Sequence, residues 1–412
     1  MIGIYDVIAG CRSCGARDLE RVLAFGDMPL SDRLVDPEED SSVEPRIPLT
    51  LVFCPECSLV QIEETVSPDV LFGADYPYFS SYSDTLLDHS KRNVEALIDR
   101  YQLSSGDLVV ELASNDGYLL QFFAEAGIDV LGIDPAPGPA AVAVENGVPT
   151  LVEFFGRNVA ERLASEGVEA DVIIGNNVLA HVPDQNAFVA AMATLLSPSG
   201  SIVMEVPYVR DLIENTEFDT IYHEHHCYFS VRSLEGLFAR HGLSLNRVEH
   251  HPIHGGSLRF FASAEPDREA SVDEYLADEA IAGMDSIGYY QDFAARVDGV
   301  KVALTGLIGE LRRGGARVAA YGAAAKGAIL LNYAGLDGEQ LDYVVDRNPH
   351  KQGKLMPGVR LPIHDPSKIG EDPPDYLLIL PWNFKDEIME QQADFAAGGG
   401  RFIIPIPEPT LV

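Results

Sequence analysis

Residues 107–136, DLVVELASNDGYLLQFFAEAGIDVLGIDPA, constrain the fold of this 412-residue chain more than any other segment. Residues 108–112 form an apolar run broken only by Glu111, which is typical of a buried parallel strand. The turn SNDG leads into an amphipathic stretch over residues 118–126, and a second apolar strand then ends on Asp134. A doubly wound sheet usually binds a ribose with a carboxylate at this position. The pattern therefore predicts an α/β domain with a site for a nucleotide-type cofactor.

The dinucleotide fingerprint GxGxxG is missing from this turn. Glu111-x-Ala-x-x-x-Gly117 stands in its place and resembles the first motif of class I S-adenosylmethionine (SAM) methyltransferases, with Ala113 and Asn115 where glycine is commoner. The resemblance implies SAM contacts from Glu111, Asn115, Gly117 and Asp134. A strand, turn and helix followed by an acid also occur in dehydrogenases, so this motif alone leaves a nicotinamide or flavin site open.

A second motif, DVIIGNNVLAHVPD at residues 171–184, resembles the fourth strand of the same methyltransferases and the loop that follows it. In that family the loop packs beside the cofactor and faces the substrate. Asn176, Asn177 and His181 follow the strand, at the edge where open α/β sheets bind ligands. We therefore expect Asn177 near the methyl end of SAM, and His181 as a substrate contact or as part of the pocket wall.

Four of the five cysteines form two identical knuckles, Cys11-Arg-Ser-Cys14 and Cys54-Pro-Glu-Cys57. Two such pairs supply the four thiolates that a tetrahedral zinc ion requires. Disulfides are the alternative, but we expect a leaderless chain whose thiols stay reduced. Four sulfur ligands close the ion to substrate, so we predict a structural zinc site and a small strand-rich insert over residues 24–53.

Length and charge limit the domains and partners of the protein. A chain of 412 residues is too long for one core and suggests two or three domains. The formal charge of −35 argues against nucleic acid and anionic membranes as partners, and it disfavours self-association, so we expect a monomer. The sequence has no apolar stretch of about 18 residues, and we expect a cytoplasmic protein.

The segment YHEHHCYFS at residues 222–230 is the strongest catalytic candidate, because its histidines and glutamate at residues 223–226 place four titratable side chains in succession. It is not an HExxH zinc site, and a metal site built from His223, His225 and Cys227 is a weaker alternative. Core or solvated histidines are another alternative. A tyrosine hydroxyl and a carboxylate beside a histidine suit acid–base chemistry near neutral pH, so we favour a catalytic role.

A tyrosine-rich stretch, DYPYFSSYSD at residues 75–84, precedes the helical pattern of residues 85–101. Tyr76, Tyr78 and Tyr82 suit packing at a domain junction, because tyrosine buries its ring and keeps its hydroxyl wet. They equally suit a lid over cofactor and substrate. Both interpretations stay open.

The order of these features resembles the SAM-dependent sugar C-methyltransferases of antibiotic deoxysugar pathways over essentially the whole chain. The resemblance rests on the cysteine knuckles, VVELASNDG, NNVLAHVPD, YHEHHCYFS and YGAAAKG. It is closest to C-3′-methyltransferases of dTDP-linked 3-amino-4-keto-2,3,6-trideoxyhexoses, the tetronitrose and kijanose type, whereas sister enzymes methylate C-3 or C-5 of other deoxysugars. It implies a zinc-binding module (residues 1–75), a class I methyltransferase sheet (76–268) and a C-terminal Rossmann-like α/β lobe with a long connecting helix (269–412).

The chemistry implied by that family fits these residues. A 4-keto group acidifies the hydrogen on C-3, so a base within hydrogen-bond reach can form an enolate that attacks the SAM methyl group. By resemblance, His225 is the base and Glu224 a second-choice base or orienting group. Tyr222 and Tyr76 become donors to the sugar or enolate oxygen, and Tyr78 becomes a further substrate contact.

The C-terminal lobe begins again with a strand, the turn YGAAAKG and a helix, and its second strand ends on an acid. This order suggests NAD and an NAD-dependent nucleotide-sugar oxidoreductase or dehydratase, but GxxxKG replaces GxGxxG. The family resemblance instead implies that the lobe binds the nucleotide-sugar. Lys326 at a helix start suits a phosphate, with Arg347 and Lys351 nearby in a basic patch. His254 is an outside candidate for the pocket, and a non-catalytic scaffold for zinc and nucleotide remains another alternative.

Overall fold

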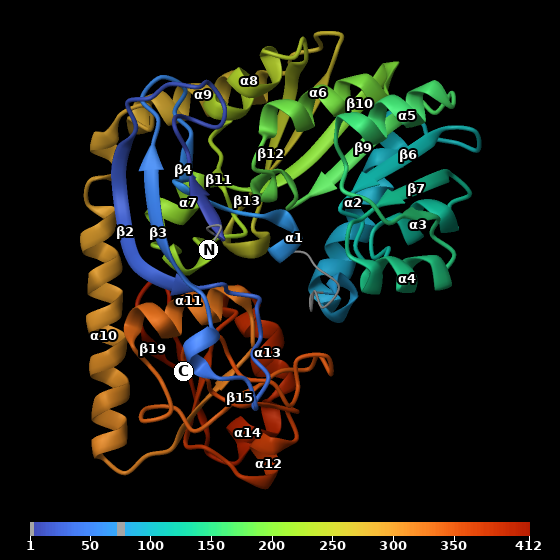
Figure 1. Ribbon diagram of the computed structural model, residues 1–412. Coiled ribbons are helices and arrows are strands. Elements are labelled where there is room, and N and C mark those ends of the chain that lie inside the picture. The colour runs from blue at the N-terminus through green and yellow to red at the C-terminus, as the bar shows by residue number, and fades with distance from the viewer. Residues whose placement is uncertain (1–3, 72–78) are drawn as a thin grey trace.

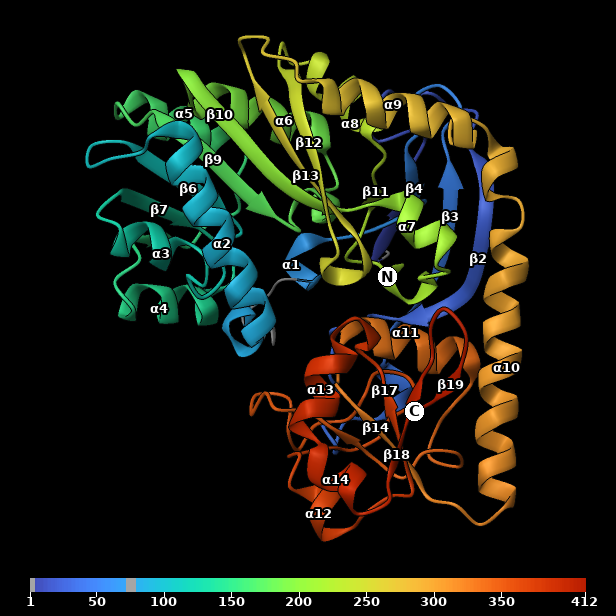
Figure 2. The same cartoon turned by 180° about the vertical axis from the view of Figure 1, so that it is seen from behind.

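The structure is a computed structural model that describes residues 4–71 and 79–412. Figure 1 shows the N-terminal strands beside the central sheet, and a separate C-terminal lobe below them. Helix α10 (Phe293–Arg313) runs along one side of the N-terminal strands and the lobe, as the view from behind also shows (Figure 2). None of the described helices is both long and apolar enough to span a membrane.

The central sheet has seven strands in the order β12-β13-β10-β9-β6-β7-β8. Five of them run parallel, and two antiparallel strands complete one edge. The parallel strands are β6 (Leu108–Leu112), β7 (Asp129–Ile133), β8 (Thr150–Leu151), β9 (Ala170–Asn176) and β10 (Leu196–Pro207). The two strands at the edge are β12 (Ser244–His251) and β13 (Ser257–Ser263), and β13 runs antiparallel to both β10 and β12. The predicted α/β fold class is confirmed.

Helices cover both faces of this sheet, which explains the uninterrupted apolar runs in its strands. Neighbouring residues of a strand point to opposite faces. Val109 and Ile174 pack with α2 and α3 in one core, whereas Val110 and Ile173 pack with α5 and α6 in another. The helices are α2 (Asp84–Tyr101), α3 (Leu120–Glu125), α5 (Arg157–Ser165) and α6 (Gln185–Leu195). A strand that is buried on both faces is apolar at nearly every position.

The N-terminal module contains an antiparallel sheet in the order β11-β4-β3-β2 and a two-stranded β1–β5 ribbon. Its own strands are β1 (Tyr5–Val7), β2 (Glu20–Pro29), β3 (Arg46–Phe53), β4 (Val60–Ile62) and β5 (Glu64–Val66). The strand-rich insert expected over residues 24–53 is present as the paired β2 and β3. The fourth strand, β11 (Cys227–Tyr228), belongs to the histidine-rich segment and pairs with β4. This pairing was not expected from the sequence, and it ties the catalytic candidate to the N-terminal module.

The C-terminal lobe contains a six-stranded sheet in the order β16-β15-β14-β17-β18-β19, parallel except for β19. Its strands are β14 (Val318–Tyr321), β15 (Val344–Val345), β16 (Ile363–His364), β17 (Tyr376–Ile379), β18 (Arg401–Ile404) and β19 (Thr410–Leu411). Helix α11 (Ala325–Ala334) follows β14, as the pattern predicts. The connection to this lobe contains two helices instead of one, because Gly283 ends α9 (Ala270–Ala282) with a φ of +78° before α10 begins.

Helix α9 secures the chain that follows β11 through one buried carboxylate. The Glu279 side chain, 2% exposed, accepts hydrogen bonds from the backbone N–H groups of Val231 at 2.7 Å and Arg232 at 3.0 Å. These N–H groups begin α8 (Val231–Ala239), and the Tyr208 hydroxyl donates a third bond to Glu279 at 3.0 Å. Glu279 therefore caps a helix whose position sets that of the preceding histidine-rich segment.

We predict that Glu279→Ala lowers the free energy of unfolding by about 3 kcal/mol, because buried donors lose their acceptor. Glu274→Ala, an exposed position on the same helix, is the control and should change it by less than about 0.5 kcal/mol. Urea denaturation of both variants measures the difference. Equal stability of the two variants would contradict the capping role.

Candidate functional site

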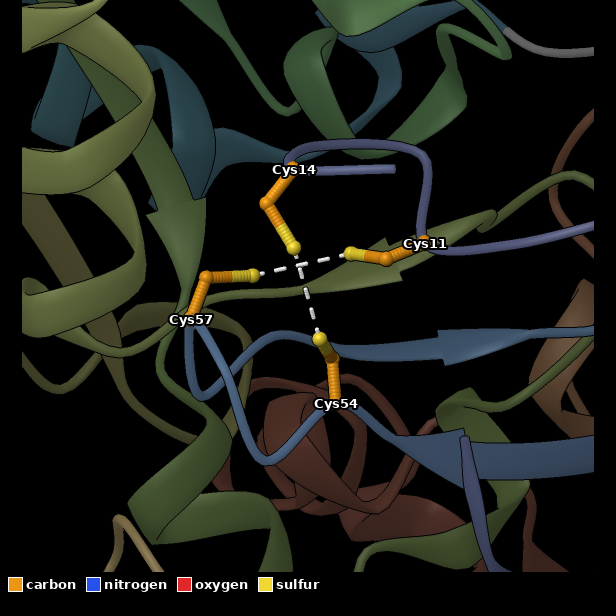
Figure 3. A group of neighbouring side chains, drawn as sticks. All are labelled: Cys11, Cys14, Cys54 and Cys57. Atoms are coloured by element: carbon orange, nitrogen blue, oxygen red, sulfur yellow. Dashed lines mark hydrogen bonds between the residues drawn. The ribbon is translucent and has the colours of Figure 1, made fainter. Parts of the chain in front are cut away.

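The four knuckle cysteines converge on one point in the N-terminal module (Figure 3). Their Sγ atoms all lie within 4.8 Å of one another, and the Cys11–Cys57 and Cys14–Cys54 pairs are each separated by 3.5 Å. Four thiolates around a tetrahedral zinc ion lie about 3.8 Å apart, whereas the two sulfurs of a disulfide lie about 2.05 Å apart. The arrangement fits a structural zinc ion on the four predicted ligands.

Arg12, inside the first knuckle, connects the zinc centre to the rest of the site. Its guanidinium donates to the Glu64 carbonyl at 2.9 Å, to Thr65 Oγ1 at 2.7 Å and to the Pro183 carbonyl at 3.5 Å. Pro183 belongs to the loop that carries His181. The knuckle backbone thus fixes a residue that contacts both β5 and the loop after β9.

We predict that Cys14→Ser reduces the zinc content of the purified protein and lowers its melting temperature, because structural zinc contributes directly to folding. Elemental analysis and calorimetry measure the two effects. The fifth cysteine, Cys227, lies outside the cluster, so Cys227→Ala should keep the native zinc content. Native zinc content in Cys14→Ser would contradict the assignment of the ligands.

A cavity of about 560 Å³ lies where the central sheet, the N-terminal module and the C-terminal lobe meet. Its walls come from the carboxyl ends of β6, β7 and β9, from the histidine-rich segment and from the start of α11. Nine residues predicted from the sequence line it: Asn115, Asp134, Asn176, Asn177, His181, Tyr222, His225, Lys326 and Lys351. The structure therefore brings the predicted cofactor, catalytic and substrate residues to one site.

The loop after β6 has the backbone shape of a glycine-rich turn although two of its key residues are not glycine. Ala113, Asn115 and Gly117 have φ values of +56°, +50° and +78°. The left-handed region is uncommon for alanine, so this departure from the glycine-rich pattern adds strain and leaves the turn unchanged.

The Asp134 carboxylate, at the end of β7, accepts the Asn115 and Ala136 N–H groups, each at 2.8 Å. Burial raises the pKa of Asp134 to about 6.

The cavity wall also offers unused polar groups on the cofactor side. Asn176 is 9% exposed, and its side-chain oxygen and nitrogen have no hydrogen-bond partner among the described residues. A buried amide without partners costs about 1–3 kcal/mol, which a polar ligand can recover. Asn176, Asn177 and Asp134 thus fit a cofactor with both a ribose and a charged amino-acid part, as SAM has.

Two predicted cofactor residues lie behind the cavity wall. Glu111 is fully buried in β6, and burial raises the pKa of its carboxyl well above the usual range. At Gly117, a Cβ atom would lie 3.1 Å from Val148 Cγ2 and 3.3 Å from Ala143 Cβ. Glu111 and Gly117 therefore shape the loop, and the structure does not bring either to the cavity surface.

The histidine-rich segment presents a tyrosine–histidine pair to the cavity. His225 Nδ1 lies 2.9 Å from the Thr220 carbonyl oxygen, which only accepts, so Nδ1 carries the proton and Nε2 is unprotonated. The Tyr222 hydroxyl donates to this Nε2 at 3.0 Å. The His181 ring lies 4.6 Å from the His225 ring, centroid to centroid. Burial lowers the pKa of His225 well below 6.5 and that of His181 to about 4, so both rings are neutral.

The alternative metal site on the same segment does not form. Among the described residues, the atoms of His223, His225 and Cys227 are not grouped at metal-binding distances. The His223 ring instead donates to the Pro48 carbonyl at 3.0 Å.

Glu224, next to His225, is 2% exposed and lies outside the cavity wall. The Asp32 backbone N–H donates weakly to Glu224 Oε1 at 3.4 Å. Burial, together with the nearby Asp32 carboxyl, raises the pKa of Glu224 to about 8. Glu224 therefore holds a proton at neutral pH, which favours an orienting role over that of the base.

We predict a pH signature for this buried carboxyl. Because the folded-state pKa of Glu224 is raised to about 8, its contribution to stability is full below about pH 4.3 and is lost as the pH rises towards 8. Glu224→Gln removes this titration, so its melting temperature should fall less between pH 5 and pH 8 than that of the native protein. The exposed control Glu274→Gln should follow the native slope, and a native slope in Glu224→Gln would contradict the raised pKa.

Two of the three predicted cations of the C-terminal lobe reach the cavity. Lys326 Nζ donates to Asn383 Oδ1 at 2.8 Å and lies 4.7 Å from the centroid of the Trp382 ring. Lys351, 7% exposed, donates to the Ala323 carbonyl at 2.8 Å. Arg347 does not reach it: its side chain is 44% exposed, and Nη1 lies 3.7 Å from Glu387 Oε1.

Some residues of the cavity wall were not predicted from the sequence. Asp32, Glu217 and Asn383 line the cavity, and no motif marks them because each comes from an unremarkable polar stretch. The outside candidate His254 also lines it.

Of the tyrosine-rich stretch, Tyr76 and Tyr78 lie outside the described residues. Tyr82 is 40% exposed and is not on the wall, whereas Ser80 is, and its N–H donates to Asn115 Oδ1 at 2.8 Å.

Comparison with protein families divides the chain in the same order. Residues 11–72 match the family described as "Putative zinc binding domain", and residues 86–248 match "Methyltransferase domain". Residues 252–407 match "C-methyltransferase C-terminal domain". The fold and the site thus define a SAM-dependent methyltransferase with a cysteine-rich zinc module at its N-terminus.

Among individual proteins, C-methyltransferase NovU from Streptomyces niveus is 39% identical over 415 aligned residues, which cover 100% of this chain and 99% of that protein. Ubiquinone biosynthesis O-methyltransferase from Stutzerimonas stutzeri (strain A1501) is 33% identical over 26% of this chain and 46% of its own length. The chain belongs to the C-methyltransferase family.

Magnesium protoporphyrin IX methyltransferase from Synechocystis PCC 6803 with bound SAM aligns at 18% identity with a TM-score of 0.34, over 44% of this chain and 82% of that one.

Proposed function

We propose that this C-methyltransferase methylates C-3′ of a dTDP-linked 3-amino-4-keto-2,3,6-trideoxyhexose in antibiotic deoxysugar biosynthesis. The observation that carries the proposal is the Tyr222–His225 pair, whose unprotonated Nε2 lies in the same cavity as the cofactor residues Asp134 and Asn177. Carbon methylation needs a base beside an acidified C–H bond and an electrophilic methyl group within reach. Bound SAM supplies that methyl group from its sulfonium.

His225 acts as the base in this proposal. The Thr220 carbonyl holds the proton on Nδ1, so Nε2 is the atom that accepts the hydrogen from C-3. The Tyr222 hydroxyl, which donates to Nε2 at 3.0 Å, turns to the C-4 oxygen and stabilises the enolate as the C–H bond breaks. With SAM bound, the electron pair on C-3 would form the new bond to the methyl carbon while the methyl–sulfur bond breaks and leaves its electrons on the sulfur of S-adenosylhomocysteine. His225 would then release its proton to solvent.

The remaining residues bind and orient the two ligands. Asp134, Asn115 and Asn177 contact SAM, with Glu111 and Gly117 supporting the loop from behind. His181 packs against the His225 ring at the sugar. Tyr76 and Tyr78, outside the described residues, remain proposed as a donor to the sugar oxygen and as a substrate contact.

The diphosphate of the sugar nucleotide lies at the start of α11. Helix N-termini favour anions, and both Lys326 and Lys351 line this part of the cavity. Burial lowers the pKa of Lys326, whereas the nearby Asp219 and Glu217 raise it. A bound diphosphate would favour the charged form of Lys326. Arg347 adds a longer-range positive charge at the rim.

We predict that His225→Asn lowers kcat by about 10²- to 10⁴-fold, because the base is lost, and leaves SAM affinity unchanged. Mass spectrometry of the sugar product measures turnover, and titration calorimetry measures SAM binding. The control His364→Asn, on the C-terminal sheet away from the cavity, should be fully active. NMR of the product locates the methyl group on C-3′; methylation at C-5, or near-native turnover by His225→Asn, would contradict the proposal.

A further inference from the structure

Asp32 is a cavity residue that the N-terminal module supplies. It follows β2, lines the cavity with Tyr222 and His225, and its backbone N–H reaches Glu224. Three residues further on, Val35 pairs with Leu355 of the C-terminal lobe through hydrogen bonds of 3.0 and 2.8 Å. The segment is therefore held in place from two sides, and the position of Asp32 is set by the backbone.

The carboxylate of Asp32 differs from the other two carboxyl groups in the described cavity wall. Asp134 accepts two backbone N–H groups, and Glu217 accepts the Asn215 side-chain amide at 3.1 Å. No described residue donates a hydrogen bond to the Asp32 carboxylate. An acceptor that lines a cavity and has no donor of its own is free to bind a ligand.

Two ionisable neighbours, Lys351 and Glu224, define the kind of donor that fits Asp32. Burial raises the pKa of the Asp32 carboxyl, and the positive charge of the nearby Lys351 opposes this and favours the ionised form. Lys351 Nζ itself donates to the Ala323 carbonyl at 2.8 Å, so it leaves the Asp32 oxygens without a donor among the described residues. Glu224 lies on the other side of Asp32. Its pKa is raised to about 8, so Glu224 is the member of this carboxyl pair that holds a proton at neutral pH. An ionised carboxylate close to the proposed base accepts an amino group more strongly than a hydroxyl, because the amino group can be positively charged.

We infer that Asp32 determines substrate specificity by accepting the amino group on the sugar carbon that is methylated. The inference rests on the proposed function, because it assigns a contact within that substrate. It gives the N-terminal module a second task besides binding zinc: the module supplies a direct contact to the sugar. Glu217 is the less suitable acceptor, because it already accepts a hydrogen bond from the Asn215 side chain at 3.1 Å and burial raises its pKa to about 8.

The test compares two sugars in the full-length zinc-loaded enzyme. The probes are dTDP-3-amino-4-keto-2,3,6-trideoxyhexose and its counterpart with a hydroxyl at C-3, dTDP-4-keto-2,6-dideoxyhexose. In Asp32→Asn we expect KM for the amino sugar to rise about tenfold or more, because a charge-assisted hydrogen bond becomes a neutral one, with kcat changed by less than about threefold. KM for the hydroxyl sugar should change by less than about threefold.

Asp36→Asn, four residues further on and exposed, is the matched control and should behave as the native enzyme with both sugars. Asp32→Ala is the second variant, and melting temperatures and SAM affinities of all three confirm folding. An equal rise in KM for both sugars, or no rise for either, would overturn the role of Asp32 and leave the proposed function standing. If the native enzyme methylated neither sugar while binding SAM, the proposed function and this inference would both fall.

Discussion

The short pairing of β11 with β4 is the interaction on which the rest of the site depends. Cys227 pairs with Gln61, and the Ile62 N–H donates to the His226 carbonyl at 3.0 Å. On the other side, the His226 N–H donates to the Ala180 carbonyl at 2.7 Å, beside His181. The histidine-rich segment has almost no regular structure of its own, so these bonds to two other parts of the chain fix the direction of the His225 ring. Backbone bonds of this kind are obligatory once the segment is buried.

Burial then sets the chemical state of the groups in the cavity. Removal from water disfavours charge, which keeps His181 and His225 neutral and keeps Glu217 protonated. A neutral His225 with its proton fixed on Nδ1 is ready to accept a proton without first losing one. The same low polarity strengthens the bond between Tyr222 and Nε2, so a proton transfer in this cavity needs little rearrangement of its surroundings.

Local patterns in the sequence predicted the parts of the structure that depend on local physics. The apolar runs of β6 and β9 and the two cysteine knuckles carry their information within a few residues, and the fold class follows from them. The amphipathic and glycine signals also located α2 and the turn at Gly117. Sites formed by residues close in sequence are therefore accessible to this reasoning.

Long-range placement was not accessible in the same way. Nothing in residues 30–34 marks Asp32 as a cavity residue, because its position follows from the contact between Val35 and Leu355. Glu111 is the opposite case: it is fully buried and does not line the cavity, so the contact with the cofactor that its motif suggests stays a prediction. Pattern matching identifies the loop and does not say which of its side chains face the ligand.

The division of the walls among three parts of the chain has a physical consequence for catalysis. The base belongs to a segment held by the N-terminal module and the loop after β9, the cofactor residues belong to the central sheet, and the lysines belong to the C-terminal lobe. The Val35–Leu355 pair joins the N-terminal module to the lobe, and the stacked rings of Phe79 and His350, 4.9 Å apart, join the central domain to it. A small movement of the lobe would shift the sugar relative to both base and methyl donor. Because misplacement of about 1 Å can cost a factor of about 10² in rate, these contacts between the parts contribute to catalysis as well as to stability.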